Sequence, residues 1–365
     1  MSDATAPTHV SVNDLGHGAA DLELAPGGRP LAPVVVVDLG DRTGAEPEAV
    51  QHAVSRLARA HVPVVGWSTG PLPRSLEPVA RAVDLTLCPS ASTSASASAP
   101  PPWVVAVEDP EAALGSLVDA VRTHPVTATI LCQTLRLTSS LSVADGLAAE
   151  SLAYSSLLAS GDFLRWRSAT PRRPVAATVD PVRVARHGDV LRVVLDRPDR
   201  RNAYSAAIRD GLVEALDLAA WDETITEVHL AGSGPTFCSG GDLDEFGTMD
   251  DVSVAHLIRL RQGAGAAVAR VAARVTAHLH GPCIGAGIEV PAFAGSVLAS
   301  PGTTFRLPEL RMGLIPGAGG TVSIPRRIGR WRTAYLALSG APIGIETAQA
   351  WGLVDGLDGP VDRTG

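Results

Sequence analysis

Short apolar runs alternate with helical stretches through the second half of this chain. Runs typical of strands occupy 190–195, 227–231, 275–280 and 297–299. Apolar residues at helical spacing predict helices over 205–220 and 252–273, and a short helix is expected near Gly285. Strands separated by helices favour a mostly parallel, covered sheet. The pattern therefore predicts an α/β fold.

The first half predicts a strand-helix-strand unit followed by helices. The expected segments are strands over 34–38, 61–66 and 103–107, a helix around 50–58 and helices within 110–167. Residues 1–30 are expected to form a flexible tail, and the Ser/Ala and proline run over 90–102 a flexible linker. The proline-rich stretch over 170–181 predicts a boundary between domains spanning 31–175 and 181–365.

Composition excludes several classes of protein. The 365 residues include no lysine, which rules out a Schiff base or a P-loop lysine. A net charge of −8 argues against a nucleic-acid partner. We expect a cytoplasmic protein, because no apolar run is long enough to span a membrane and no signal-peptide pattern is present. The four scattered cysteines favour reduced thiols.

Three glycine-bearing segments carry the candidate chemistry. They are Phe237 to Asp242, Gly285 to Glu289, and Pro308-Glu309 with Gly317 to Gly320. Small residues at such turns leave backbone N–H groups free and let a ligand approach closely. Two converging N–H groups make an oxyanion hole, and two carboxyls in one apolar pocket can divide the acid and base roles.

These motifs and their order resemble the crotonase (enoyl-CoA hydratase/isomerase) superfamily from about residue 182 to residue 357. The resembling segments are Leu195 to Pro198 with Asn202-Ala203, Phe237 to Asp242, His280 to Pro282 with Gly285 to Glu289, Leu307 to Glu309, Gly313 to Thr321, and Trp351 to Val354. The resemblance implies a crotonase-like β-β-α spiral in the C-terminal half. It also implies an acyl-CoA substrate, no metal, no cofactor beyond the CoA of the substrate, and a homo-oligomer, either a trimer or a hexamer.

The resemblance assigns roles to particular residues. The N–H groups of Gly241 and Ala286 would hold the thioester oxygen, Glu289 would activate water, and Glu309 would protonate the α-carbon. Because both acids are present, the resemblance favours a 2-enoyl-CoA hydratase, a lyase of fatty acid metabolism. An isomerase, hydrolase or decarboxylase acting on another acyl-CoA, or a non-catalytic partner subunit, remains open.

Further residues are candidates for binding the substrate. They are Ser239, Gly240, Asp242, Gly285, Gly317, Gly319 and Arg197. Alternatives stand beside them: a loop-capping role for Asp242, and a solvated surface position for Arg197. The residues after Asp242, through Met249 and on to Leu260, are expected to line the acyl pocket.

Two positions depart from the pattern. Ala286 stands where the family more often has glycine, which costs little if its φ is negative. Pro291 follows two residues after Glu289, where a proline is expected to bend the helix.

The chain reaches Gly365 soon after Gly352-Leu353-Val354, whereas family members usually continue for several helices. Residues 110–174 resemble those helices, and residues 34–66 resemble a shortened crotonase strand-helix-strand. We therefore interpret the N-terminal region as a degenerate crotonase-like α/β segment with a helical tail. We expect this tail to cap the second half, in the same chain or in a neighbouring one.

Overall fold

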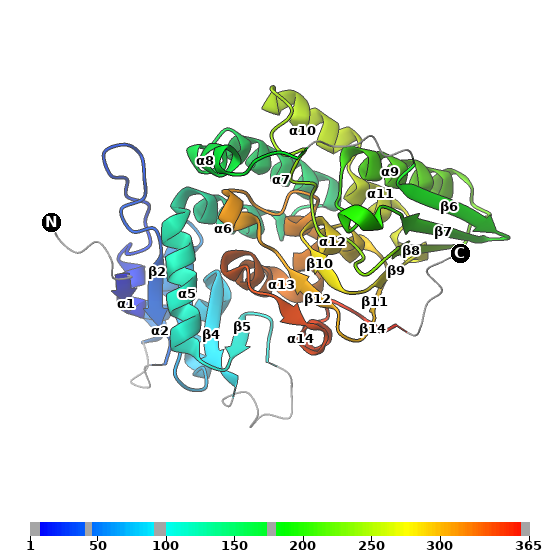
Figure 1. Ribbon diagram of the computed structural model, residues 1–365. Coiled ribbons are helices and arrows are strands. Elements are labelled where there is room, and N and C mark those ends of the chain that lie inside the picture. The colour runs from blue at the N-terminus through cyan, green and yellow to red at the C-terminus, as the bar shows by residue number, and fades with distance from the viewer. Residues whose placement is uncertain (1–7, 41–45, 91–99, 174–179, 359–365) are drawn as a thin grey trace. The chain divides into compact units, whose positions relative to one another are not determined.

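The computed structural model describes residues 8–40, 46–90, 100–173 and 180–358. Its contacts divide the chain into two compact units (Figure 1). Unit 1 comprises Met1–Arg136 and Gly329–Ser339, and unit 2 comprises Leu137–Ile328 and Gly340–Gly365. This division differs from the boundary expected between residues 174 and 181, because residues 137–173 group with the C-terminal half of the chain.

Unit 1 is built on a five-stranded parallel sheet whose strands lie in chain order. The strands are β1 (Thr8–Val10), β2 (Val35–Asp38), β3 (Val64–Trp67), β4 (Leu85–Pro89) and β5 (Val104–Val107). Among the described residues, the helices that connect or follow them include α1 (Val12–Gly16), α2 (Pro47–Leu57), α3 (Glu77–Ala82) and α5 (Pro110–Thr123). The strands expected over 34–38, 61–66 and 103–107 are therefore present. Most of the linker expected over 90–102 lies outside the described residues.

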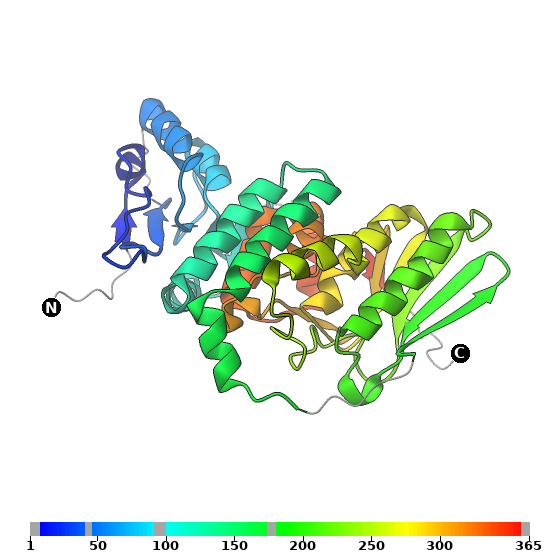
Figure 2. The same ribbon diagram turned by 90° about the horizontal axis from the view of Figure 1, so that it is seen from above.

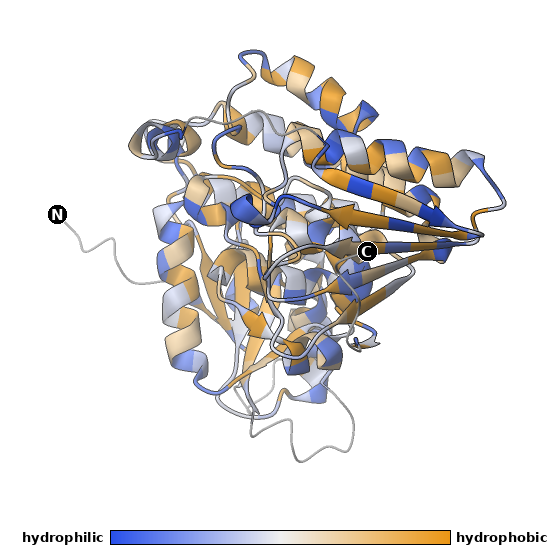
Figure 3. Cartoon of the chain, turned by 45° about the vertical axis from the view of Figure 1, so that its right-hand side comes forward, coloured by the Kyte–Doolittle hydropathy of each residue, from blue (hydrophilic) through white to orange (hydrophobic). Residues whose placement is uncertain are grey.

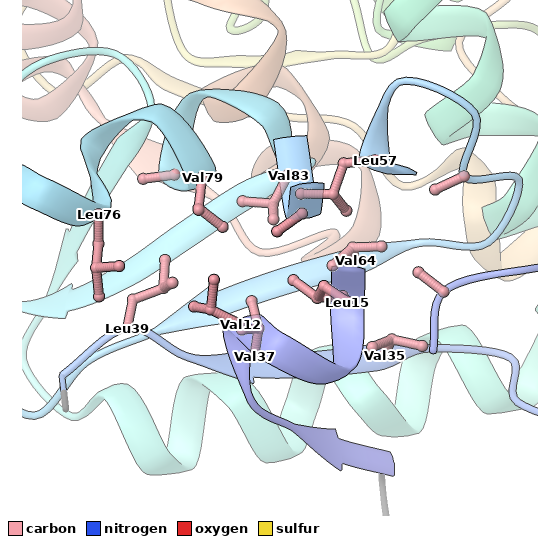
Figure 4. Packing of buried hydrophobic residues seen from close by; sticks show 14 of the residues in the cluster. Val12, Leu15, Val35, Val37, Leu39, Leu57, Val64, Leu76, Val79 and Val83 are labelled. Carbon is pink, nitrogen blue, oxygen red and sulfur yellow. The ribbon is translucent and has the colours of Figure 1, made fainter. Parts of the chain in front are cut away.

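The segment expected to be a loose tail contributes to the core of unit 1. Ser11 caps α1 in a reciprocal capping box with Asp14, which satisfies the first backbone N–H groups of the helix. Val12 and Leu15 are buried in the same cluster as Val35 and Val37 (Figure 4). The prediction of a flexible tail is thus wrong for residues 8–16, because two apolar side chains suffice to dock this short helix.

A buried ion pair links α6 (Pro125–Thr138) to the sheet within unit 1. Arg136 Nε donates to Oδ1 of Asp84 at 2.8 Å, and the Asp84 side chain is only 2% exposed. Arg136 also donates to the carbonyls of Ala60 and Val62. The Asp84 carboxylate additionally accepts from the N–H of Val64, and Nη1 of Arg330 lies 3.7 Å from its Oδ1, so its charge is compensated from several segments.

Unit 2 contains a six-stranded sheet and a three-stranded sheet. The larger has the order β14-β11-β9-β8-β7-β6 and is parallel except for the β6–β7 hairpin. Its strands are β6 (Val182–His187), β7 (Val190–Leu195), β8 (Glu227–Gly232), β9 (Val275–Leu279), β11 (Ser296–Ala299) and β14 (Gly356–Leu357). Several of these strands are largely hydrophobic (Figure 3). The smaller sheet consists of β10 (Pro282–Ile284), β12 (Thr304–Arg306) and β13 (Ile343–Gly344).

Helices cover the sheets of unit 2. They are α7 (Val143–Leu158), α8 (Gly161–Ala169), α9 (Ala206–Trp221), α10 (Val252–Arg261), α11 (Ala264–Arg270), α12 (Ala286–Glu289), the first part of α13 (Gly320–Ser339) and α14 (Ile345–Trp351). Ser205 caps α9, and α7 lies beside α10 (Figure 2). None of the helices in the described residues is long and apolar enough to cross a membrane.

A glycine divides one predicted helix of unit 2, and a proline limits the length of another. The single helix expected over 252–273 is two helices, because Gly263 adopts an extended conformation (φ −71°, ψ 115°) as the N-cap of α11. The helix after Gly285 ends at Glu289, and a 3₁₀ turn over Pro291–Phe293 follows. The proline thus limits α12 to one turn, as its missing N–H predicts.

We predict that Arg136→Met lowers the free energy of unfolding of unit 1 by about 3 kcal/mol, because it removes the arginine that bonds directly to the buried Asp84 and leaves only the more distant Arg330 at 3.7 Å. The matched control is Arg56→Met, which breaks an ion pair with Asp21 at the surface and should cost less than about 1 kcal/mol. Urea unfolding measures both values. Equal losses in the two variants would show that the buried pair has no special role.

Candidate active site

Unit 2 contains a pocket of about 650 Å³ that gathers residues from distant parts of the chain. Its walls come from α7, the start of α9, the loop over 241–249, α10, α11, α12 and the turn over 317–319. Apolar side chains, including Leu147, Met249 and Ile258, line part of it. The segment from Asp242 to Leu260, expected to line an acyl pocket, therefore does contribute to this cavity.

Two glycine-bearing turns pack against each other at one wall. The N–H of Ile284 donates to the carbonyl of Cys238 at 3.1 Å, and Cys238 and Cys283 form an isolated parallel bridge. A Cβ at position 287 would lie 2.2 Å from the carbonyl oxygen of Cys238, so only glycine permits this approach. The turn that carries Gly241 and the helical turn that carries Ala286 are thereby held together.

The N–H groups of Gly241 and Ala286 are available to a ligand. Both residues line the pocket, and no backbone carbonyl among the described residues accepts from either N–H. Ala286 begins α12 with an ordinary negative φ, so its side chain causes no backbone strain. Within the described part of the chain, both N–H groups are therefore free of backbone acceptors at the wall of the pocket.

The carboxyl groups of Glu289 and Glu309 converge at Gly285. A Cβ added there would lie 2.4 Å from Oε1 of Glu309 and 3.5 Å from Oε1 of Glu289. Gly285 has φ 50°, which also favours glycine. Both glutamates line the pocket, although they are 2% and 8% exposed. The Oε1 atoms of the two acids therefore lie near the same point beside Gly285.

Glu289 and Glu309 differ in their hydrogen bonds. Oε2 of Glu289 accepts from the N–H groups of Ala318 at 2.8 Å and Gly320 at 3.0 Å. Oε2 of Glu309 is buried and has no hydrogen-bond partner among the described residues. Backbone donors stabilise an ionised carboxylate, whereas an apolar site favours the neutral acid.

Burial raises the pKa of both groups. The pKa of Glu309 rises to about 8, chiefly through burial, which keeps this carboxyl protonated at neutral pH. Burial and the nearby Glu309 and Glu150 carboxyls also raise the pKa of Glu289, while the Ala318 and Gly320 N–H groups oppose the rise. Because both pKa values are raised, only the hydrogen bonds distinguish the two acids: the backbone donors at Glu289 favour its ionised form, whereas Oε2 of Glu309 has no such donor among the described residues.

A network of ion pairs fixes the loop after Gly241. Asp242 is 1% exposed, and its carboxylate lies 3.3 Å from Nη1 of Arg197 and 3.0 Å from Nη2 of Arg200. Arg200 also contacts Asp244, which accepts a hydrogen bond from the backbone of Arg173. Arg197 is buried, binds Asp242 through its guanidinium and is not among the residues that line the pocket, so the solvated surface position considered for it is wrong.

The remaining candidates fall into two groups. Asp242, Gly317 and Gly319 line the pocket, as a substrate-binding role requires. Ser239, Gly240 and Gly285 do not line it and instead shape the turns behind its wall. Cys238 is buried, and its burial raises the thiol pKa to about 12, which suits a core residue rather than a nucleophile.

Sequence reasoning gave no site role to several polar residues of the pocket, among them Glu150 and Tyr154, whereas Arg259 lies in the segment that was expected to line it. Glu150 and Tyr154 lie on α7, and Arg259 on α10 places its guanidinium over the Tyr154 ring. The signal for the first two was present, since the resemblance over 110–174 includes the glutamate and tyrosine of this helix. Their proximity to Glu289 depends on how the chain folds and left no local pattern.

Known proteins resemble this chain over its C-terminal half. A family model described as enoyl-CoA hydratase/isomerase matches residues 185–362. A 2,3-dehydroadipyl-CoA hydratase of Escherichia coli is 34% identical over 171 residues, which cover 47% of this chain and 66% of the relative. An enoyl-CoA isomerase/hydratase of Mycosarcoma maydis is 31% identical over 188 residues, which cover 49% of this chain and 69% of the relative.

Solved structures include similar chains. An enoyl-CoA hydratase of Thermoplasma volcanium is 30% identical, with a TM-score of 0.46, and the match covers 49% of this chain and 72% of that one. This chain spans slightly less than two thirds of the length of the E. coli relative. The names of the relatives include both hydratases and isomerases, so they define the family rather than one reaction. The chain belongs to the enoyl-CoA hydratase/isomerase family of the crotonase superfamily and has its α/β fold.

Proposed function

We propose that this protein is a 2-enoyl-CoA hydratase, which adds water across the double bond of a 2-enoyl-CoA. The observation that carries the proposal is the meeting of two buried carboxyls, Glu289 and Glu309, at Gly285. They differ in their hydrogen-bond partners, as an acid and a base in one site must. The proposed reaction needs no metal and no cofactor beyond the CoA carried by the substrate.

The thioester oxygen would accept hydrogen bonds from the N–H groups of Gly241 and Ala286. Negative charge develops on this oxygen when water attacks the β-carbon, because the electrons of the double bond move toward the thioester. Each well-placed donor stabilises such charge by about 3 kcal/mol in comparable enzymes. These N–H groups lie on turns fixed by backbone contacts, so they would need little rearrangement.

The two acids would divide the proton transfers. Glu289 takes one proton from water as the oxygen bonds to the β-carbon, and Glu309 gives its proton to the α-carbon. The product is a 3-hydroxyacyl-CoA, and one water has been added in total. A proton then passes from Glu289 to Glu309, directly or through solvent, and restores the starting state. Like other members of the family that it resembles, the protein is proposed to act as a homo-oligomer, a trimer or a hexamer.

We predict that Glu289→Gln and Glu309→Gln each lower kcat for crotonyl-CoA hydration by about 10²- to 10⁴-fold, because each removes one proton-transfer group. The assay follows the loss of the ultraviolet absorbance of the enoyl thioester. Saturated butyryl-CoA should still raise the melting temperature of both variants, since the N–H donors are unchanged. The exposed Glu214→Gln on α9 is the control and should keep full activity.

Three other outcomes of the hydration and melting-temperature assays would favour a different function. Substantial activity in Glu289→Gln but not in Glu309→Gln would favour an isomerase that depends on one acid. Stabilisation by butyryl-CoA without hydration of any enoyl-CoA would contradict the hydratase proposal and favour another acyl-CoA reaction. No stabilisation by any CoA ester would favour a non-catalytic partner subunit.

We also predict that the free energy of unfolding falls as the pH rises from about 5 to about 8. Burial raises the pKa of Glu150 to about 7 and that of Glu309 to about 8, from 4.5. Over this range the folded protein holds protons that the unfolded chain has released, so their stabilising effect is present below pH 4.5 and is lost through pH 7 to 8.

The slope should be about 1.4 kcal/mol per pH unit for each proton retained in the folded state. Glu309→Gln should flatten the slope by about one proton, whereas Glu214→Gln should leave it unchanged. Urea unfolding at several pH values measures the slope. Parallel curves for wild type and Glu309→Gln would contradict the assignment of a proton to Glu309.

A further inference from the structure

We propose that Glu150 of α7 is a positioning residue for Glu289. It holds the N–H groups of Gly319 and Thr321, so that the alternate N–H groups, those of Ala318 and Gly320, face the Glu289 carboxyl group. Neither the family resemblance nor the sequence assigns a role to Glu150. Its importance for catalysis rests on the proposed hydratase function, but its effect on the backbone does not.

Glu150 binds the start of α13 with both carboxyl oxygens. Oε1 accepts from the N–H of Gly319 at 2.8 Å. Oε2 accepts from the N–H of Thr321 at 2.9 Å and from its hydroxyl at 2.7 Å. The Glu150 side chain is buried, so water cannot readily replace these bonds.

Glu289 binds the same backbone segment from alternate positions. Its Oε2 accepts from Ala318 and Gly320, whereas Glu150 accepts from Gly319 and Thr321. Four consecutive N–H groups are thus divided alternately between two buried carboxyls. Each peptide unit is planar and is joined to the next through one Cα, so a change in φ or ψ that releases the N–H of Gly319 also tends to reorient the neighbouring N–H groups of Ala318 and Gly320.

Other contacts hold Thr321 and α7 in register. The hydroxyl of Thr138 donates to the carbonyl of Thr321 at 2.6 Å. A Cβ at Gly146 would lie 3.2 Å from the Val322 side chain, so α7 approaches α13 closely at that point. Ser142 caps α7 through the N–H of Asp145. The helix that carries Glu150 is therefore anchored independently of the glutamate itself.

Charged groups surround Glu150 on several sides. Arg259 of α10 stabilises its ionised form, and it also bonds to Ser151 and Ser155 of α7. Glu289 and Glu309 are near enough for the Glu150 charge to raise their pKa. The start of α13 supplies backbone N–H groups, which favour a negative charge. Glu150 thus connects the backbone geometry of the site with its electrostatics.

Glu150 lies outside the part of the chain that the family model matches. It lies before residue 185, where the family match begins, and 169 residues separate it from Gly319. The segment that precedes the matched core therefore supplies a side chain to the site. This segment does more than cover the pocket, since it orients the backbone that binds Glu289.

The first test is amide hydrogen exchange in Glu150→Gln, measured residue by residue by NMR. Glutamine keeps the size of the side chain but replaces one acceptor oxygen with an NH₂ donor. We expect the amides of Ala318 and Gly320, which do not bond to Glu150, to exchange about 10-fold faster than in wild type. The amides of Val36 and Val65 in unit 1 should be unchanged.

The second test is kinetic. Misplacement of a catalytic group by about 1 Å can cost about 10²-fold, so kcat for crotonyl-CoA should fall by that factor in Glu150→Gln. The dissociation constant for butyryl-CoA should stay within about 3-fold of wild type, because the proposed oxyanion donors are unaffected. If Glu150 acts through Glu289, the double variant Glu150→Gln/Glu289→Gln should be no slower than Glu289→Gln alone.

The outcomes separate this inference from the proposed function. Wild-type exchange rates at Ala318 and Gly320 in Glu150→Gln, or losses that multiply in the double variant, would overturn the positioning role. Absence of hydration by the wild type would overturn the hydratase proposal, while the exchange rates would still decide the role of Glu150. If Glu150→Gln fails to fold, Thr321→Val removes only the hydroxyl donor and should accelerate the same two amides to a smaller extent.

Discussion

The structure of the site depends on how four consecutive backbone N–H groups, from Ala318 to Thr321, are satisfied. Two buried carboxylates share them alternately, and neither carboxylate would be tolerated in the interior without such donors. The cost of burying Glu289 is thus offset at the start of α13, where unpaired N–H groups need acceptors in any case. The glutamate can then direct its other oxygen toward Gly285 and Glu309.

The bonds from Glu150 to this backbone also join unit 2 to a segment that precedes the residues matched by the family model. Residues 137–173 belong to this unit, and α7 and α8 pack against α10 and the 3₁₀ turn over Glu309–Met312. The helices that resemble the end of family members therefore precede the core in this chain and pack against it within the same chain.

Much of unit 2 was predictable because its signals are local. The buried strands β7, β8 and β9 and the Ser205 cap of α9 follow from short patterns, and the resemblance selected Glu289 and Glu309, which the structure brings together. Features set by tertiary contacts were missed. The burial of Arg197 depends on Asp242, which is 45 residues away, and the bonds of Glu150 join segments 169 residues apart. The short strands of the three-stranded sheet have too few residues for a periodic pattern.

Hydration of the double bond is the central claim, and isotopic labelling tests it most directly. Crotonyl-CoA would be incubated with the protein in water enriched in heavy oxygen, and the product would be analysed by mass spectrometry. The proposed mechanism predicts a 3-hydroxyacyl-CoA that carries one labelled oxygen at the β-carbon, formed by wild type and not by Glu309→Gln. A product with the mass of the substrate, or a product whose label resides in a free acid released from CoA, would contradict it.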